Sequence, residues 1–71
     1  MGEGAPIVLN AANEVSVKAF LERKISFLNI FDLNSDMLDR YGDAKACDIE
    51  TIFSIDEKVR AASLKWVAGR S

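Results

Sequence analysis

Residues 5–22 read APIVLNAANEVSVKAFLE, and the rest of the bundle should pack around this segment. Placed on a helical wheel, its apolar residues recur at the three- and four-residue spacings of a helix. They form one broad face and spread beyond it, with Val8, Leu9, Ala12, Val15, Ala19 and Phe20 on that face and Ile7, Val17 and Leu21 on other faces. A helix that is apolar nearly all round is a buried helix. The stretch therefore predicts a central helix with protein on several of its sides.

Polar residues interrupt this helix at three positions, Asn10, Asn13 and Glu14, and it should end near Arg23 or Lys24. Burying polar groups without hydrogen bonds costs on the order of 1–3 kcal/mol each. We therefore expect the three side chains to act as polar anchors, which meet partners inside a bundle or on another piece of protein. For Glu14, a hydrogen-bonded structural carboxylate is favoured over a catalytic one.

The middle of the chain predicts a link and a second helix. Residues 25–28 should form a short extended link. The second helix should span residues 29–41, where Ile30, Leu33 and Met37 repeat at helical spacing. Its N-cap should be a polar residue of the link or of its start, Ser26 or Asn29, and its C-cap the left-handed Gly42.

The last third of the chain predicts a short turn and a third main helix. Asp48 should cap a single helical turn at 49–53. Ser54 and Glu57 have the spacing of a capping box, so the last helix should begin there. The expected fold is all-α, a small bundle of three main helices plus a short helical turn, in one domain over 1–71 with no second domain. The residues expected in its core are Val8, Leu9, Val15, Phe20, Ile30, Met37, Ile55, Val59 and Trp66.

Length, charge and composition exclude several classes of protein. The chain has 71 residues and a net charge of −2, and its nine basic residues form no cluster. Nucleic-acid binding needs clustered Lys and Arg, so we expect no nucleic-acid partner. No run approaches the ~18 apolar residues of a membrane span, and no signal peptide opens the chain, so we expect no membrane partner. The single cysteine and the lack of an export signal favour a cytoplasmic protein.

No group of residues in this sequence predicts catalysis, cofactor binding or a metal site. The chain has no histidine, which excludes Ser-His and Cys-His pairs within it. Cys47 precedes Asp48, whose carboxylate disfavours the thiolate, so a plain thiol is favoured. Asp32, Asp36 and Asp39 share one side of the second helix, where a solvated face is favoured over a cation site. We therefore assign no catalytic, cofactor-binding or metal-binding residue.

The run APIVLNAANEVSVKAFLERKISFLNI at 5–30 resembles the C-terminal helical domain of the 1-deoxy-D-xylulose 5-phosphate reductoisomerase family. In that family a stretch like APAVLNAANEVAVAAFL is followed by an extended I-x-F-x-D-I link, which reads ISFLNI here. A later family pattern like SLEDVLAADAWAR is similar to DIETIFSID at 48–56, with Val59 and Arg60 in place of its final Ala-Arg. LNAANEV is the specific part of the resemblance, and the rest supports it.

The resemblance implies a role within a larger enzyme. Enzymes of the family convert 1-deoxy-D-xylulose 5-phosphate to 2-C-methyl-D-erythritol 4-phosphate in non-mevalonate isoprenoid biosynthesis. They use NADPH as the reductant and a divalent ion, magnesium, manganese or cobalt. The domains that bind cofactor, metal and substrate precede this segment, and none of their motifs occurs here, so no catalytic residue is carried over. We therefore expect a non-catalytic C-terminal piece of a bacterial cytoplasmic enzyme, whose remaining domains are its partners.

The resemblance also bears on the bundle itself. In the family another helix precedes this segment and completes a four-helix bundle, so the chain is expected to be part of such a bundle. Two positions depart from the family pattern. Leu28 replaces a threonine or serine and Asn29 replaces an aspartate, which moves the expected cap of the second helix to Asn29 and leaves the fold unchanged.

One alternative is a free-standing small helical module whose apolar face binds a partner protein. The capping and apolar patterns fit both interpretations, and LNAANE favours the enzyme domain. In either case Ile7, Val17 and Leu21 lie off the main face of the first helix, where one core cannot cover them all. Uncovered apolar surface usually finds a partner, so we expect the isolated chain to associate with a second copy through this helix.

Overall fold

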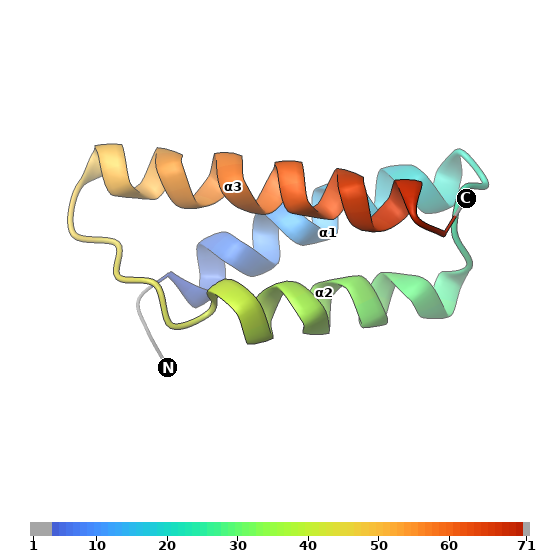
Figure 1. Cartoon of the computed structure of the whole chain (residues 1–71), viewed down its shortest axis with the longest axis horizontal. Coiled ribbons are helices and arrows are strands. Elements are labelled where there is room, and N and C mark those ends of the chain that lie inside the picture. The colour runs from blue at the N-terminus through green and yellow to red at the C-terminus, as the bar shows by residue number, and fades with distance from the viewer. Residues whose placement is uncertain (1–3, 71) are drawn as a thin grey trace.

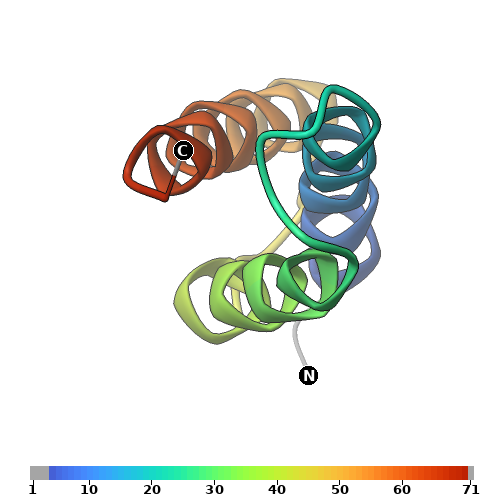
Figure 2. The ribbon, with the colours of Figure 1, turned by 90° about the vertical axis from the view of Figure 1, so that its right-hand side faces the viewer.

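The computed structural model describes residues 4–70, which form three helices. They are α1 (Ala5–Leu21), α2 (Phe27–Tyr41) and α3 (Ile49–Ala68). Figure 1 shows the helices running along the long axis of the molecule, and the end-on view in Figure 2 shows α1 joining α2 and α3 on one side. The predicted all-α bundle is confirmed. The predicted domain limits of 1–71 stay a prediction, because residues 1–3 and 71 lie outside the described part.

α1 ends earlier than the sequence pattern indicates. Arg23 has a positive φ of 62°. Its N–H donates to the Phe20 carbonyl oxygen, and the Lys24 N–H donates to the Ala19 carbonyl oxygen, both at 2.9 Å. This pair of bonds is a Schellman motif, which satisfies carbonyls that the last helical turn leaves unpaired. The helix therefore stops at Leu21, and the predicted end near Arg23 or Lys24 is wrong by two or three residues.

α2 begins two residues earlier than predicted, at Phe27, because Ser26 is its N-cap. The Asn29 N–H donates to the Ser26 hydroxyl oxygen at 3.3 Å, and the Ser26 N–H donates to Asn29 Oδ1 at 3.1 Å. This reciprocal capping box takes two residues from the expected extended link. The helix ends at Tyr41 as predicted, but Gly42 is right-handed with φ −62°, so the left-handed cap is wrong.

α3 is one continuous helix, and the separate turn predicted at 49–53 is wrong. Asp48 caps the helix, since the Thr51 N–H donates to its Oδ1 at 2.8 Å. Ser54 lies exposed inside the helix and makes no new start. Extending a helix costs far less than nucleating a second one, so a Ser-to-Glu spacing inside a good helical pattern does not break it.

The bundle has one core, which lies between the three helices. Val8, Leu33, Met37 and Val59 are completely buried at its centre. The contact surface of α1 is made of small residues, including the buried Ala11, Ala12, Ser16 and Ala19. Small side chains let a neighbouring helix approach closely, so the alanine-rich middle of α1 explains why this helix contacts both others more extensively than they contact each other.

The residues expected in the core fall into three groups. Val8, Ile30, Met37, Ile55 and Val59 are buried. Three others, Val15, Phe20 and Trp66, are half-buried and pack against the core.

Leu9 is 43% exposed, and its assignment to the core is wrong. It lines a groove between α1 and α2 together with Phe31 and Leu38. Trp66 is also less buried than expected. The Arg70 guanidinium covers its ring instead, 3.8 Å from the ring centroid, in a cation–π contact at the surface.

Candidate functional site

The three predicted anchors lie on the outer side of α1. Asn10, Asn13 and Glu14 are all exposed, so they do not sit inside the bundle. Glu14 and Asn13 nonetheless bond to different neighbouring helices, the first to α3 and the second to α2. Asn10 lines two shallow grooves on either side of α1. The candidate site is therefore an outward surface centred on the LNAANE run of the sequence.

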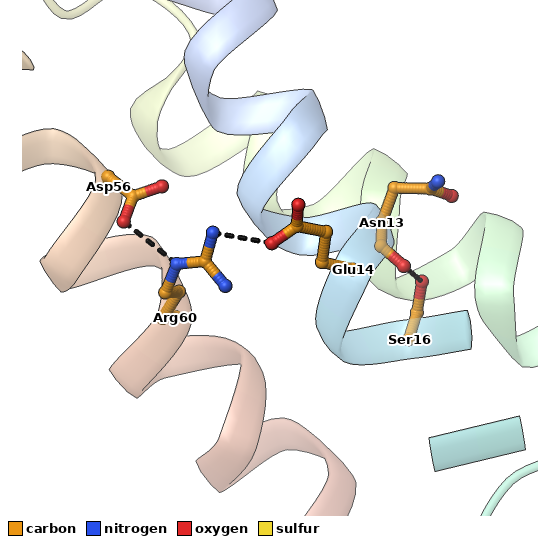
Figure 3. A network of polar contacts seen from close by, with 5 residues as sticks. All are labelled: Asn13, Glu14, Ser16, Asp56 and Arg60. Carbon is orange, nitrogen blue, oxygen red and sulfur yellow. Dashed lines mark hydrogen bonds and ion pairs between the residues drawn. The ribbon is translucent and has the colours of Figure 1, made fainter. Parts of the chain in front are cut away.

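On the α3 side of this surface, the contacts are ionic. Figure 3 shows Arg60 of α3 reaching toward α1, where its Nη2 donates to Glu14 Oε2. The Arg60 Nε donates to Asp56 Oδ2 at 2.8 Å, one helical turn earlier on the same helix. The side chains of Arg60 and Glu14 are 39% and 55% exposed, so water screens this pair strongly.

On the α2 side the contacts are neutral. The Ser16 hydroxyl is fully buried and is shared between the Asn13 carbonyl oxygen at 3.1 Å and Asn34 Oδ1 at 3.2 Å. The Asn34 Nδ2 donates to Asn13 Oδ1 at 3.2 Å. Both polar atoms of the Asn34 amide are therefore used within the domain, in a chain that links α1 to α2 without a formal charge.

Among residues 4–70, Asp48 and Arg60 have perturbed pKa values. The pKa of Arg60 is raised, first by its hydrogen bond to Asp56 and then by the one to Glu14, so the guanidinium stays charged at every relevant pH. The pKa of the Asp48 carboxyl is lowered, first by the backbone N–H of Thr51 and then by the Thr51 hydroxyl. Both shifts stabilise the charged form of a structural ion pair or helix cap. Neither group is poised for proton transfer near neutral pH.

The structure also places the other candidates from the sequence. Cys47 is an exposed free thiol in the loop before α3. Asp36 pairs with Arg40 one turn along α2 at 3.2 Å, and Asp32 accepts a hydrogen bond from Asn29. Within residues 4–70 no group of three or more His, Cys, Asp or Glu residues could hold a metal ion. The described helices include none that is long and apolar enough to cross a membrane.

Sequence reasoning missed three residues of this surface, Arg60, Asn34 and Ser16. The Asp56–Arg60 spacing of four residues is a readable signal for a pair along one helix. The contacts of Arg60 with α1 and of Asn34 with α1 bridge 46 and 21 residues of sequence. No local pattern indicates such contacts, because they depend on how the helices pack.

Comparisons with known proteins identify the family to which this sequence is similar. Residues 1–62 match a family model described as "DXP reductoisomerase C-terminal domain". The chain is 41% identical over 66 residues to the 1-deoxy-D-xylulose 5-phosphate reductoisomerase of Pseudomonas putida. The matched region covers 93% of this chain and 16% of that protein. The Wigglesworthia glossinidia enzyme of the same name is 42% identical over 66 residues, 93% of this chain and 17% of that protein. The Zymomonas mobilis enzyme is 44% identical over 59 residues, 83% of this chain and 15% of that protein.

These relatives are much longer than the chain. It spans about one sixth of their length, 16% for the Pseudomonas putida enzyme. No solved structure matches the chain at a significant level.

Proposed function

The chain belongs to the family of DXP reductoisomerase C-terminal domains, and on this premise we propose that it is the scaffold domain of a complete reductoisomerase. The match over residues 1–62 carries the proposal. The complete enzyme converts 1-deoxy-D-xylulose 5-phosphate to 2-C-methyl-D-erythritol 4-phosphate in the bacterial cytoplasm, as a step of non-mevalonate isoprenoid biosynthesis. The partners of this domain are the remaining domains of that enzyme.

The proposed cofactors are NADPH and a divalent ion, Mg²⁺, Mn²⁺ or Co²⁺, and the residues described here do not fit either group. Dinucleotide binding of the usual kind needs a glycine-rich turn between a strand and a helix, and residues 4–70 contain helices without strands. Divalent ions need clustered oxygen ligands, which the same residues do not supply. We assign both groups to other domains, and a titration of the chain with NADPH, with and without Mn²⁺, should show no saturable binding.

The direct test of the scaffold role is a chimera. The 66 matched residues of the Pseudomonas putida enzyme are replaced by this chain, and a deletion of the same residues is the control. We expect the chimera to keep activity within about tenfold of the unchanged enzyme, because no group that contacts substrate is altered, and the deletion to be inactive. A folded chimera that is as inactive as the deletion would contradict the proposed function.

Without the rest of an enzyme, the chain should associate with itself. Leu21 is 72% exposed and Val17 36% exposed on α1, whereas Ile7 packs partly against the core. We expect sedimentation equilibrium to give a mass that rises above the 7.8 kDa of one chain with concentration. A mass that stays at 7.8 kDa up to about millimolar protein would show that the helices need no second copy.

A further inference from the structure

A groove between α1 and α2, of about 740 Å³, differs in charge from the other grooves of the described residues. Its walls are the apolar side chains of Leu9, Phe31 and Leu38, and none of its lining residues is charged, although 28% of the chain is charged. Each of the four other grooves described for residues 4–70 includes charged side chains. The centre of a protein interface is depleted of charge in the same way, because desolvating a charge is costly.

Some polar groups at this groove already have hydrogen-bond partners within the domain. Asn34 has both amide atoms bonded within the domain, to Ser16 and Asn13. Covering it with another piece of protein therefore leaves one Nδ2 hydrogen of Asn34 to be paired. Figure 3 shows the Asn13 side chain turned away from the Arg60 side of α1, and its Oδ1 is already an acceptor for Asn34. The Asn13 Nδ2, the exposed Asn10 amide and the exposed Ser35 hydroxyl can then bond to an occupant.

Aromatic side chains extend the apolar surface along α2. Phe27 and Phe31 are each 57% exposed, and their rings meet edge to face with centroids 5.4 Å apart. Phe20 of α1 also meets Phe27 edge to face, with centroids 5.8 Å apart. These contacts restrict the rings before any partner arrives. Exposed, pre-ordered aromatic side chains are typical anchors of a protein interface, since little side-chain entropy is lost on contact.

We propose that this α1–α2 face, made of the groove and Phe27, is covered by an uncharged polypeptide segment from the rest of the reductoisomerase. An apolar side chain of that segment fills the groove between Leu9 and Phe31, and its backbone carbonyls accept hydrogen bonds from Asn10 and Asn13. The inference rests on the proposed function. The chain spans 16–17% of its relatives' length, so about five sixths of their polypeptide lies outside it and supplies the occupant. A neutral occupant is the one that complements a groove without charge.

The test uses two phenylalanines of the same chain as a matched pair. Phe31 lies on the α1–α2 face and is 57% exposed, and Phe53 lies near the start of α3 and is 67% exposed. Hydroxyl-radical footprinting with mass spectrometry measures the oxidation rate of each ring in the active chimera with the Pseudomonas putida enzyme. Because a covered ring loses contact with solvent, we expect Phe31 to react about tenfold more slowly than Phe53.

Four results would overturn the inference. An active chimera in which Phe53 is protected and Phe31 is not would assign the contact to another face, and the proposed function would stand. An active chimera in which both rings react would show that the α1–α2 face is not covered, and the proposed function would stand. Concentration-dependent protection of Phe31 in the chain alone, without protection in the chimera, would assign the face to a second copy. An inactive, folded chimera with both rings reactive would contradict the proposed function as well.

Discussion

The two sides of α1 hold their neighbours by different chemistry. Toward α3, Glu14 pairs with the cation of Arg60, across a surface open to water. Toward α2, the bonds run from the buried Ser16 through the amide of Asn34 and carry no charge. Charged contacts tolerate water and lose little when they stay exposed, whereas a neutral amide chain beside apolar side chains is suited to being covered. We infer that the α3 side of α1 stays exposed to solvent and that its α2 side is covered by another part of the proposed enzyme.

The difference also predicts how much each side contributes to stability. An exposed ion pair is worth about 0–1 kcal/mol, because water and salt screen it and two long side chains lose freedom. A hydrogen bond made by a buried hydroxyl is worth about 1 kcal/mol and is insensitive to salt. Both contributions to the free energy of unfolding are smaller than that of the apolar core beneath these contacts. The helices are therefore held mainly by burial, and the polar contacts set which face of α1 meets which neighbour.

The largest effect should come from the core under the neutral side. Leu33 is completely buried in α2, and Leu33→Ala should cost about 2–5 kcal/mol. A domain of this size has roughly 3–5 kcal/mol to lose, so the variant should be largely unfolded by circular dichroism. Leu28→Ala is the matched control, since Leu28 is 71% exposed on the same helix. If both variants keep native helicity, the core is not where the structure places it.

A smaller effect should follow from breaking the neutral chain of bonds. Asn34→Ala removes the bonds to Ser16 and Asn13 and leaves the buried hydroxyl with one partner. Urea denaturation should show a loss of about 1–2 kcal/mol. Because no formal charge is involved, the loss should be the same in low and high salt. A loss that shrinks with salt would mean that the α2 side is electrostatic like the α3 side.

Breaking the ionic contacts on the α3 side should lower the free energy of unfolding by less than Asn34→Ala does. Arg60→Gln removes the pairs with Glu14 and Asp56 and should cost about 0.2–1 kcal/mol in low salt. The cost should fall toward zero at about 1 M salt, where the screening length is near 3 Å. The same urea experiment measures it, with Lys58→Gln as a control for loss of one positive charge on α3. A cost above that of Asn34→Ala would reverse the ranking of the two sides.

The smallest effect on stability should come from Asp48, the N-cap of α3, which lies on neither side of α1. The Thr51 N–H lowers the pKa of Asp48 in the folded chain below its ordinary value of 3.8. A folded pKa below the unfolded one gives stability that is full above the unfolded value and is lost as the pH falls through the folded value. Asp48→Asn keeps a good N-cap, so it should change little at neutral pH and flatten the stability curve below pH 3.8. An unchanged acid slope in the variant would show that the carboxylate is not the titrating cap.

The sequence predicted helices better than it predicted their limits. Apolar residues at helical spacing located all three helices, because burial dominates their stability. The capping-box spacing at Ser54 predicts a helix start that is wrong, since cap residues also occur inside a helix that packing extends. The left-handed Arg23 was not predictable, because a positive φ in a residue other than glycine depends on the bonds that the chain makes around it.

The role of Asn10, Asn13 and Glu14 as anchors stays a prediction. Asn13 and Glu14 were singled out as polar groups that need partners, and their partners Asn34 and Arg60 lie on other helices. Those partners could not be read from the sequence, because their contacts span 21 and 46 residues. Leu9 was assigned to the core by its place on the wheel. A wheel shows which residues share a face of one helix, and it does not show how far the neighbouring helices extend over that face.

The most direct test of the central claim changes one charge on each side of α1 at adjacent positions. Asn13→Asp keeps the oxygen that accepts from Asn34 and adds a charge on the neutral side, and Glu14→Gln removes a charge from the ionic side. Hydrogen exchange of the α1 amides measures the opening free energy in the chain alone and in the chimera. In the chain alone both changes should stay within about 0.5 kcal/mol, because both positions are exposed. In the chimera, Asn13→Asp should cost about 2–5 kcal/mol as an unpaired charge under a partner, while Glu14→Gln stays small. Equal, small effects of both changes in the chimera would contradict the claim that the neutral side of α1 is covered and the charged side is not.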